Sequence, residues 1–261
     1  MGLHFDVIPG TGPYLLLVHG FLSSRAQFES NLADLSRVAR PVVIELWGHG
    51  RSPVPKDDAL FHPDEYVHAF ERIREGLGAE RWMICGQSLG AALTLRYALA
   101  HPNRVIGHIF TNTTSAFADA AWLEGARRNV SARADAIAQG GRAGLEQMPI
   151  HPKHATRLPR DAQAALLRDT ALLDPVGVAK TMEFTVPESP LRDRAHTNSV
   201  PSLLVCGARE KRFEVYRAFA EETMPLLDVV CVDAGHAVNI EAASAFTESA
   251  SRFIGQQDDV R

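Results

Sequence analysis

The stretch MICGQSLGAALTLRYALAHP, residues 83–102, changes from a short apolar run to a helical pattern, and Ser88 lies at the change. Residues 86–90, GQSLG, match the pattern G-x-S-x-G. In that pattern a sharp turn between a strand and a helix presents the serine hydroxyl at the end of a sheet. Glycines on both sides of the serine avoid side-chain collisions across so tight a turn. We therefore predict that Ser88 is a nucleophile, with a plain turn residue as the alternative.

Six short apolar runs of the sequence are typical of β-strands, and helical patterns separate them. Such an alternation is typical of a parallel sheet covered by helices, whose strands are apolar throughout because both faces are buried. The segment before Tyr14 has room for one more strand or a short hairpin. The six predicted strands span residues 14–20, 41–47, 81–86, 105–112, 202–207 and 228–234. Predicted helices include residues 24–38, 64–78, 88–100 and 214–224.

The alternation stops after residue 115 and resumes near residue 197. Between these points, helical segments are separated by breaks rich in glycine and proline, and no stretch predicts a strand. We therefore expect an α/β core made of residues 1–115 and 197–261. A helical lid, residues 116–196, is expected to be inserted into that core.

Three residues near the start of the insertion are candidate substrate contacts. The first helix is predicted to begin after Asp119, an N-cap residue, and to end at residues 140–141, a Gly-Gly pair. Arg127 and Arg133 flank the apolar stripe of this helix. Either arginine could lean into a cleft and bind a substrate carboxylate, or both could be solvated. Trp122 is the third candidate.

A serine hydroxyl needs a base to take its proton and an acid to orient that base. Among the eleven histidines, His236 follows the last predicted strand and a glycine, and it precedes a C-terminal helical segment. The acid is expected after the strand at 202–207, where the loop offers Glu210. Asp233 is the alternative, but it lies in or beside a strand and would have to reach around to the imidazole. The predicted triad is therefore Ser88, His236 and Glu210.

Composition limits the classes of partner. The chain has 261 residues, of which 46% are hydrophobic, enough for one large domain with a substantial core. The net charge is −4 and there is no basic run, so neither nucleic acid nor an anionic membrane is expected as a partner. The N-terminus shows no basic region followed by a long apolar stretch, so a cytoplasmic location is expected. We expect a small-molecule substrate and a monomer or homodimer.

The three cysteines, Cys85, Cys206 and Cys231, each lie in an apolar run that predicts a buried strand. An odd count without CxxC spacing argues against a disulfide framework or a zinc site. We expect three reduced thiols in the core, and neither a metal nor a cofactor.

Four motifs together resemble the α/β-hydrolase superfamily over nearly the whole chain. They are HGF (19–21), GHGRS (48–52), GQSLG (86–90) and AGH (234–236), with the triad in the order Ser, acid, His. The resemblance implies the triad roles given above, an oxyanion hole made by the backbone N–H groups of Phe21 and Leu89, and a lid formed by the insertion. Residues 111–147 look like the corresponding part of 3-oxoadipate enol-lactonases and, more loosely, of the menaquinone-pathway lyases of this fold.

The resemblance implies hydrolysis of a carboxylic ester or lactone through an acyl-enzyme. One alternative is carbon–carbon bond hydrolysis or lyase chemistry with the same triad on a small carboxylated substrate; another is a non-catalytic ligand receptor. Two features depart from the family pattern. The acid, Glu210, is more often Asp, and Glu45 and Trp47 stand where Asp and a small residue are common. The Trp47 ring lies either near the opening of the site or in the core.

Overall fold

The computed structural model describes residues 2–258, and its centre is a seven-stranded sheet. The strand order is β1-β3-β2-β4-β5-β6-β7, with β1 antiparallel to β3 and all other neighbours parallel. All six predicted strands are present, and the segment before Tyr14 adds one. The strands are β1 Phe5–Val7, β2 Tyr14–Val18, β3 Arg40–Ile44, β4 Trp82–Gly86, β5 Val105–Phe110, β6 Ser202–Gly207 and β7 Leu227–Val232.

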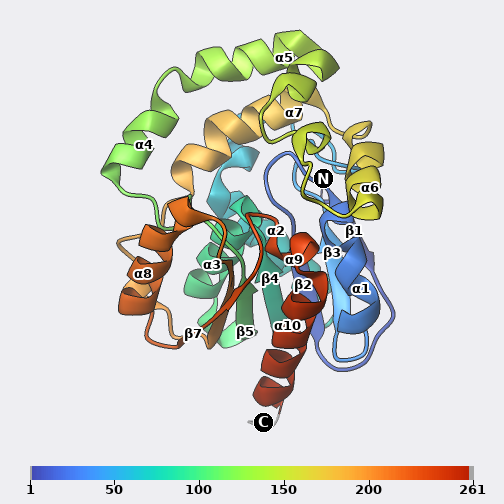
Figure 1. Cartoon of the computed structure of the whole chain (residues 1–261), viewed down its shortest axis with the longest axis vertical. Coiled ribbons are helices and arrows are strands. Elements are labelled where there is room, and N and C mark those ends of the chain that lie inside the picture. The colour runs from blue at the N-terminus through green and yellow to red at the C-terminus, as the bar shows by residue number, and fades with distance from the viewer. Residues whose placement is uncertain (1, 259–261) are drawn as a thin grey trace.

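Helices cover both faces of the sheet because successive side chains of a strand point to opposite sides. Leu15 and Leu17 of β2 pack in one cluster with Phe253 of α10, whereas Leu16 and Val18 pack in another with Phe70 of α2. Helices α1 and α10 share the first face and α2, α3 and α8 the second (Figure 1). The helices are α1 Glu29–Leu35, α2 Pro63–Gly76, α3 Leu89–Ala100, α8 Glu214–Thr223, α9 Val238–Glu241 and α10 Ala243–Asp258.

The chain between β5 and β6 is helical and lies above the sheet in Figure 1. It forms α4 Ala120–Arg127, α5 Val130–Gln147, α6 Arg160–Thr170 and α7 Pro175–Lys180. Leu22, in the loop after β2, packs with Ile137 and Val178 of this insertion. Gly177 of α7 meets Gly48 so closely that a Cβ on either residue would lie 2.4 Å from the other's Cα. The insertion is therefore packed onto the loops that follow β2 and β3.

The predicted first helix of the insertion is wrong in its length. Asp119 does cap α4, with its Oδ1 accepting the Trp122 N–H at 2.8 Å. However, Asn129 adopts a left-handed conformation, with φ 54°, and separates α4 from α5. The next helix then continues through residues 140–141 with a kink at Gly141, whose φ is 56°. Two helices therefore replace one, because a left-handed residue interrupts the predicted periodic pattern.

The prediction of three reduced core thiols is wrong for two of the cysteines. Cys206 of β6 and Cys231 of β7 are directly paired in the parallel register, with Cα atoms 4.7 Å apart, and they form a disulfide. Strand β7 is the edge strand, so Cys231 is exposed rather than buried. Cys85 is a buried free thiol, and burial raises its pKa. Strand register, which decides the pairing, was not available from the spacing of the cysteines.

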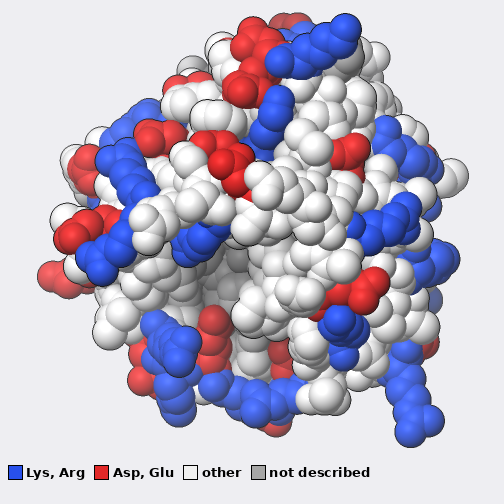
Figure 2. Space-filling view, turned by 90° about the horizontal axis from the view of Figure 1, so that it is seen from above, with Lys and Arg blue, Asp and Glu red and all other residues white. Residues whose placement is uncertain are grey.

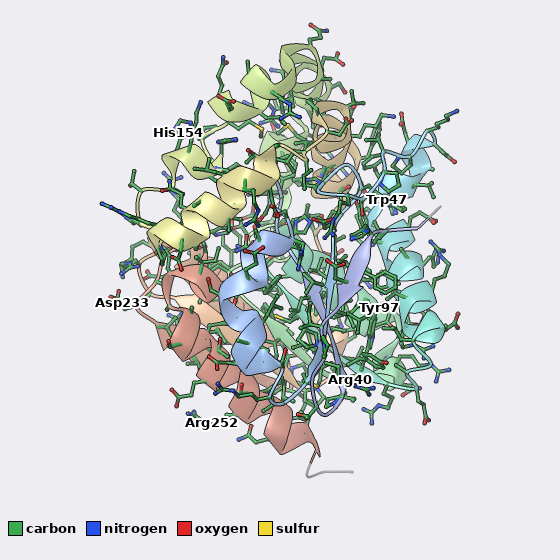
Figure 3. The ribbon with its side chains drawn as sticks, turned by 90° about the vertical axis from the view of Figure 1, so that its right-hand side faces the viewer. Arg40, Trp47, Tyr97, His154, Asp233 and Arg252 are labelled. Atoms are coloured by element: carbon green, nitrogen blue, oxygen red, sulfur yellow. A yellow bond between two sulfur atoms is a disulfide. The ribbon has the colours of Figure 1, made fainter. Side chains whose placement is uncertain are left out.

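Of the two positions expected for Trp47, the structure shows the one in the core. The side chain, labelled in Figure 3, is 1% exposed and packs in the same cluster as Phe61 and Tyr66. It does not line the cavity described below. Among the described helices, none combines the length and the apolar character needed to cross a membrane.

Candidate active site

Ser88 lies in the turn between β4 and α3 in a conformation that side chains rarely adopt. Its φ is 52° and its ψ is −115°, outside the helical and extended regions. The turn is tight: a Cβ on Gly86 would lie 2.3 Å from the Gly90 carbonyl oxygen, and a Cβ on Gly90 would lie 2.1 Å from the Val18 carbonyl oxygen. Strain of this kind persists only where the surrounding structure imposes it, and it is typical of functional sites.

His236 and Glu210 are in direct contact. Strand β7 leads into the His236 loop, and β6 leads into the loop that carries Glu210. Both carboxylate oxygens of Glu210 lie 3.0 Å from His236 Nδ1, and Asn112 donates from Nδ2 to Oε2. Burial opposes ionisation of Glu210, but the hydrogen bonds from His236 and Asn112 and the charge of the imidazolium outweigh it, so the pKa of this carboxyl is lowered. The sequence analysis did not identify Asn112 as part of the site.

Asp233, the alternative acid, points elsewhere. Its side chain, labelled in Figure 3, is 85% exposed, and its Oδ1 lies 3.1 Å from Nη1 of Arg209. The structure therefore brings Glu210, and not Asp233, to the imidazole of His236.

Ser88 and His236 line the same cavity, which has a volume of about 670 Å³. In the described part of the chain the Ser88 hydroxyl forms no hydrogen bond. Catalytic hydrogen bonds are often long before substrate binds and shorten in the reacting complex. The turn of Ser88 and the loop of His236 are also in contact, because the side chain of Gln87, the residue before Ser88, donates from Nε2 to the His236 carbonyl oxygen at 3.4 Å.

The backbone N–H groups of Phe21 and Leu89 belong to residues that line this cavity. Neither N–H is engaged by an acceptor in residues 2–258. Leu89 is the first residue of α3, where the helix dipole favours negative charge. Two free donors beside a serine are suited to an oxyanion.

Two buried histidines brace the loop that carries Phe21. His19 Nδ1 donates to the Gly20 carbonyl oxygen at 2.7 Å, and its Nε2 accepts the Leu46 N–H at 3.1 Å. His49 accepts the Leu22 N–H through Nε2 at 3.3 Å and donates from Nδ1 to the Trp47 carbonyl oxygen at 2.9 Å. Each ring must be neutral to accept a hydrogen bond. Burial lowers the pKa of His19 to about 4 and, together with the nearby His19, that of His49 to about 3.

These pKa values predict that the fold is acid-labile. Burial also lowers the pKa of His108 to about 3. An unfolded chain takes up a proton at each histidine near pH 6.5, whereas the native chain does not, so stability is complete above pH 6.5 and falls below it. Between pH 6.5 and 5, each of the three histidines should cost on the order of 2 kcal/mol. We expect the urea midpoint to fall steeply over this range; equal midpoints at pH 7 and pH 5 would contradict the neutral, buried state.

The cavity lies between the ends of the strands and the helical insertion, and Figure 2 shows a hollow in the face seen from above. Trp122 lines it, as does His154, which Figure 3 labels on the insertion. Arg127 and Arg133 do not line it. Arg127 forms an exposed ion pair with Glu188 at 2.7 Å, and Arg133 donates to the Ala126 carbonyl oxygen at 2.8 Å.

Arg157 is the one arginine or lysine of residues 2–258 that lines the cavity. It comes from the loop before α6, and the sequence offered no motif that singled it out. The single carboxylate in the lining of the described chain, Glu241, is already paired with Arg209 at 2.8 Å. Arg157 therefore gives the cavity a positive group that the sequence analysis missed.

A family model for the alpha/beta hydrolase fold matches residues 13–243. The chain belongs to this family. One relative is 24% identical to this chain over 260 residues. It is named as a putative 2-succinyl-6-hydroxy-2,4-cyclohexadiene-1-carboxylate synthase of Bacillus subtilis (strain 168). The alignment covers 95% of this chain and 93% of the relative.

Two solved structures share the fold over almost the full chain. MenH from S. aureus aligns with a TM-score of 0.86 at 20% identity, covering 98% of this chain and 99% of that one. The enol-lactonase from Burkholderia xenovorans LB400 aligns with a TM-score of 0.76 at 22% identity, covering 97% and 96%. The predicted family and fold are therefore confirmed.

Proposed function

We propose that the protein hydrolyses a carboxylic ester or lactone of a small molecule through an acyl-enzyme on Ser88. The observation that carries this proposal is the contact of both Glu210 oxygens with His236 Nδ1, on the same cavity as the strained Ser88. A carboxylate on Nδ1 leaves Nε2 of the imidazole free to accept a proton from a serine hydroxyl. Two unused N–H groups, of Phe21 and Leu89, are available for the oxyanion.

The reaction follows from these groups. Ser88 Oγ attacks the carbonyl carbon while its proton passes to His236 Nε2, and the carbonyl oxygen becomes an oxyanion held by the Phe21 and Leu89 N–H groups. The imidazolium, stabilised by Glu210, then gives its proton to the leaving alkoxide as the ester bond breaks. Water repeats the sequence on the acyl-enzyme, which releases the acid and restores Ser88. The helical insertion, residues 116–196, acts as a lid that supplies the outer wall of the cavity.

The reaction is tested by labelling and by substrates. A fluorophosphonate is expected to modify Ser88, and p-nitrophenyl esters and lactones are expected to be hydrolysed. Absence of labelling together with absence of turnover would refute an activated serine and would favour a ligand receptor.

A second candidate is lyase or carbon–carbon bond hydrolysis on the same triad. It is favoured by the nearly full-length match to a relative named as a cyclohexadiene-carboxylate synthase. Activity on a succinyl-cyclohexene acid or a vinylogous diketone, without activity on esters or lactones, would select this candidate. Fluorophosphonate labelling of Ser88 is expected under both.

We propose that Arg157, rather than Arg127 or Arg133, binds a carboxylate of the substrate. Arg157 is exposed in the free protein, so solvent weakens its contact with a carboxylate to at most about 1 kcal/mol, which corresponds to roughly a 5-fold change in binding. Arg157→Ala is therefore expected to raise KM for an ester that carries a free carboxylate and to spare a neutral ester of the same size.

Arg127→Ala is the matched control for this prediction. Arg127 lies on the same insertion but pairs with Glu188 outside the cavity, so its loss is expected to change neither KM. Steady-state kinetics on the two esters distinguishes the positions. Equal effects of Arg157→Ala on both esters would show that the Arg157 guanidinium does not bind the carboxylate of the substrate.

A further inference from the structure

Glu241 holds the backbone on both sides of His236. Its Oε2 accepts the Gly235 N–H at 2.9 Å, and its Oε1 accepts the Ala237 N–H at 3.3 Å. The side chain is only 7% exposed although it comes from the short helix α9 that follows the histidine. One carboxylate thus binds the residue before and the residue after His236.

The same carboxylate is connected to the loop that carries the acid. Arg209, the residue before Glu210, donates from Nη2 to Glu241 Oε2 at 2.8 Å. Its backbone N–H also donates to the Ala234 carbonyl oxygen at 2.9 Å. The two loops meet so closely that a Cβ on Gly207 would lie 2.0 Å from the Gly235 carbonyl oxygen. Glu241 and Arg209 therefore join the loop of the acid to the loop of the base.

We propose that Glu241 is a positioning residue, which fixes the His236 loop so that the imidazole can reach Glu210 on one side and Ser88 on the other. The inference rests on the proposed function, because it gives Glu241 a role through His236. The need for such a residue follows from the location of the loop. His236 follows the edge strand β7, and its own side chain is 47% exposed, so packing alone does little to hold the ring.

The consequence of losing the carboxylate follows from its geometry. A glutamine at position 241 keeps the shape but has one acceptor oxygen for the Gly235 N–H, the Ala237 N–H and Arg209. Its amide N–H₂ would face a donor, so one end of the His236 loop would be released. A shift of about 1 Å at a catalytic group is enough to slow a reaction by about 100-fold.

The test compares Glu241→Gln with a control on the neighbouring helix. Glu248→Gln removes a carboxylate that is 72% exposed on α10 and forms an ion pair with Arg252 at 2.7 Å. In Glu241→Gln we expect kcat for a neutral ester and the rate of fluorophosphonate labelling of Ser88 to fall together by about 10- to 100-fold, with KM unchanged. Glu248→Gln is expected to leave all three quantities at the wild-type values.

Each other result overturns the proposal. A rise in KM with unchanged kcat would make Glu241 a substrate contact, and a lower melting temperature with an unchanged labelling rate per folded molecule would make it structural. If Glu241→Gln does not fold, Arg209→Met replaces it in the test, because the Arg209 side chain is 41% exposed. Arg209→Met is expected to lower the labelling rate of Ser88 by a smaller factor. An unchanged labelling rate would refute the role of the Glu241–Arg209 contact.

If the proposed function itself is wrong, the experiment gives a different result. In that case the wild-type protein itself is neither labelled nor active on esters and lactones. A wild-type protein that is labelled, with a Glu241→Gln variant that is labelled equally fast, leaves the proposed function intact and refutes the role of Glu241 alone.

Discussion

Ser88→Ala is expected to abolish turnover while the protein remains folded. In the proposed mechanism the substitution removes the atom that forms the covalent intermediate, and members of a triad act as a unit, so kcat should fall by about 10⁴- to 10⁶-fold. Ser88 Oγ forms no hydrogen bond within the described chain, so its loss should cost little stability. The strained backbone, with φ 52°, is imposed by the turn and is shared by both variants. Single-turnover kinetics and circular dichroism measure the two effects separately.

Ser115→Ala is the matched control, because Ser115 lies on the same cavity but outside the turn. It is expected to retain activity. Mass spectrometry after fluorophosphonate treatment should find the adduct on the tryptic peptide with Ser88. Full activity of Ser88→Ala, or an adduct on Ser115, would remove Ser88 from the mechanism.

The sheet could be predicted because its strands are short apolar runs between helices. Leu15 to Val18 are buried on both faces, and the sequence shows this as an unbroken run. Strand order and register depend on contacts between distant segments and could not be predicted in the same way. Cys231 illustrates the limit, because its run resembles a buried strand but β7 forms the edge of the sheet.

The residues of the candidate site also differ in how far they could be predicted from the sequence. Ser88 was predicted from a local motif, and His236 and Glu210 from their positions after strands whose carboxyl ends meet at one edge of the sheet. The insertion could not be predicted in detail, since one left-handed residue, Asn129, separates α4 from α5. Helix α4 has no buried residue, and Arg127 remains in an exposed pair.

Glu241 was missed for another reason. It stands five residues after His236, as the last residue of the four-residue helix α9, and its carboxylate reaches back to the N–H groups of Gly235 and Ala237. The spacing alone does not show which N–H groups the carboxylate binds.

Glu210→Gln is expected to lower kcat by about 10⁴-fold if the loss resembles that of the carboxylate in serine proteases. Glutamine keeps the length of the side chain but carries no charge to stabilise the imidazolium. It also offers one acceptor where Glu210 serves two donors, His236 Nδ1 and Asn112 Nδ2. An amide N–H₂ turned toward Nδ1 would favour the tautomer in which Nε2 carries the proton and cannot accept one from Ser88.

Asp233→Asn provides the matched comparison, since it neutralises the other carboxylate near His236 with the same change of chemistry. Asp233 is 85% exposed and pairs with Arg209, and exposed ion pairs contribute at most about 1 kcal/mol. Its loss should therefore leave kcat close to the wild-type value. Because Glu210 reaches Nδ1 at 3.0 Å and Asp233 does not contact the ring, kinetics of the two variants should differ by orders of magnitude. The opposite order would assign the acid to Asp233, while the roles of Ser88 and His236 would stand.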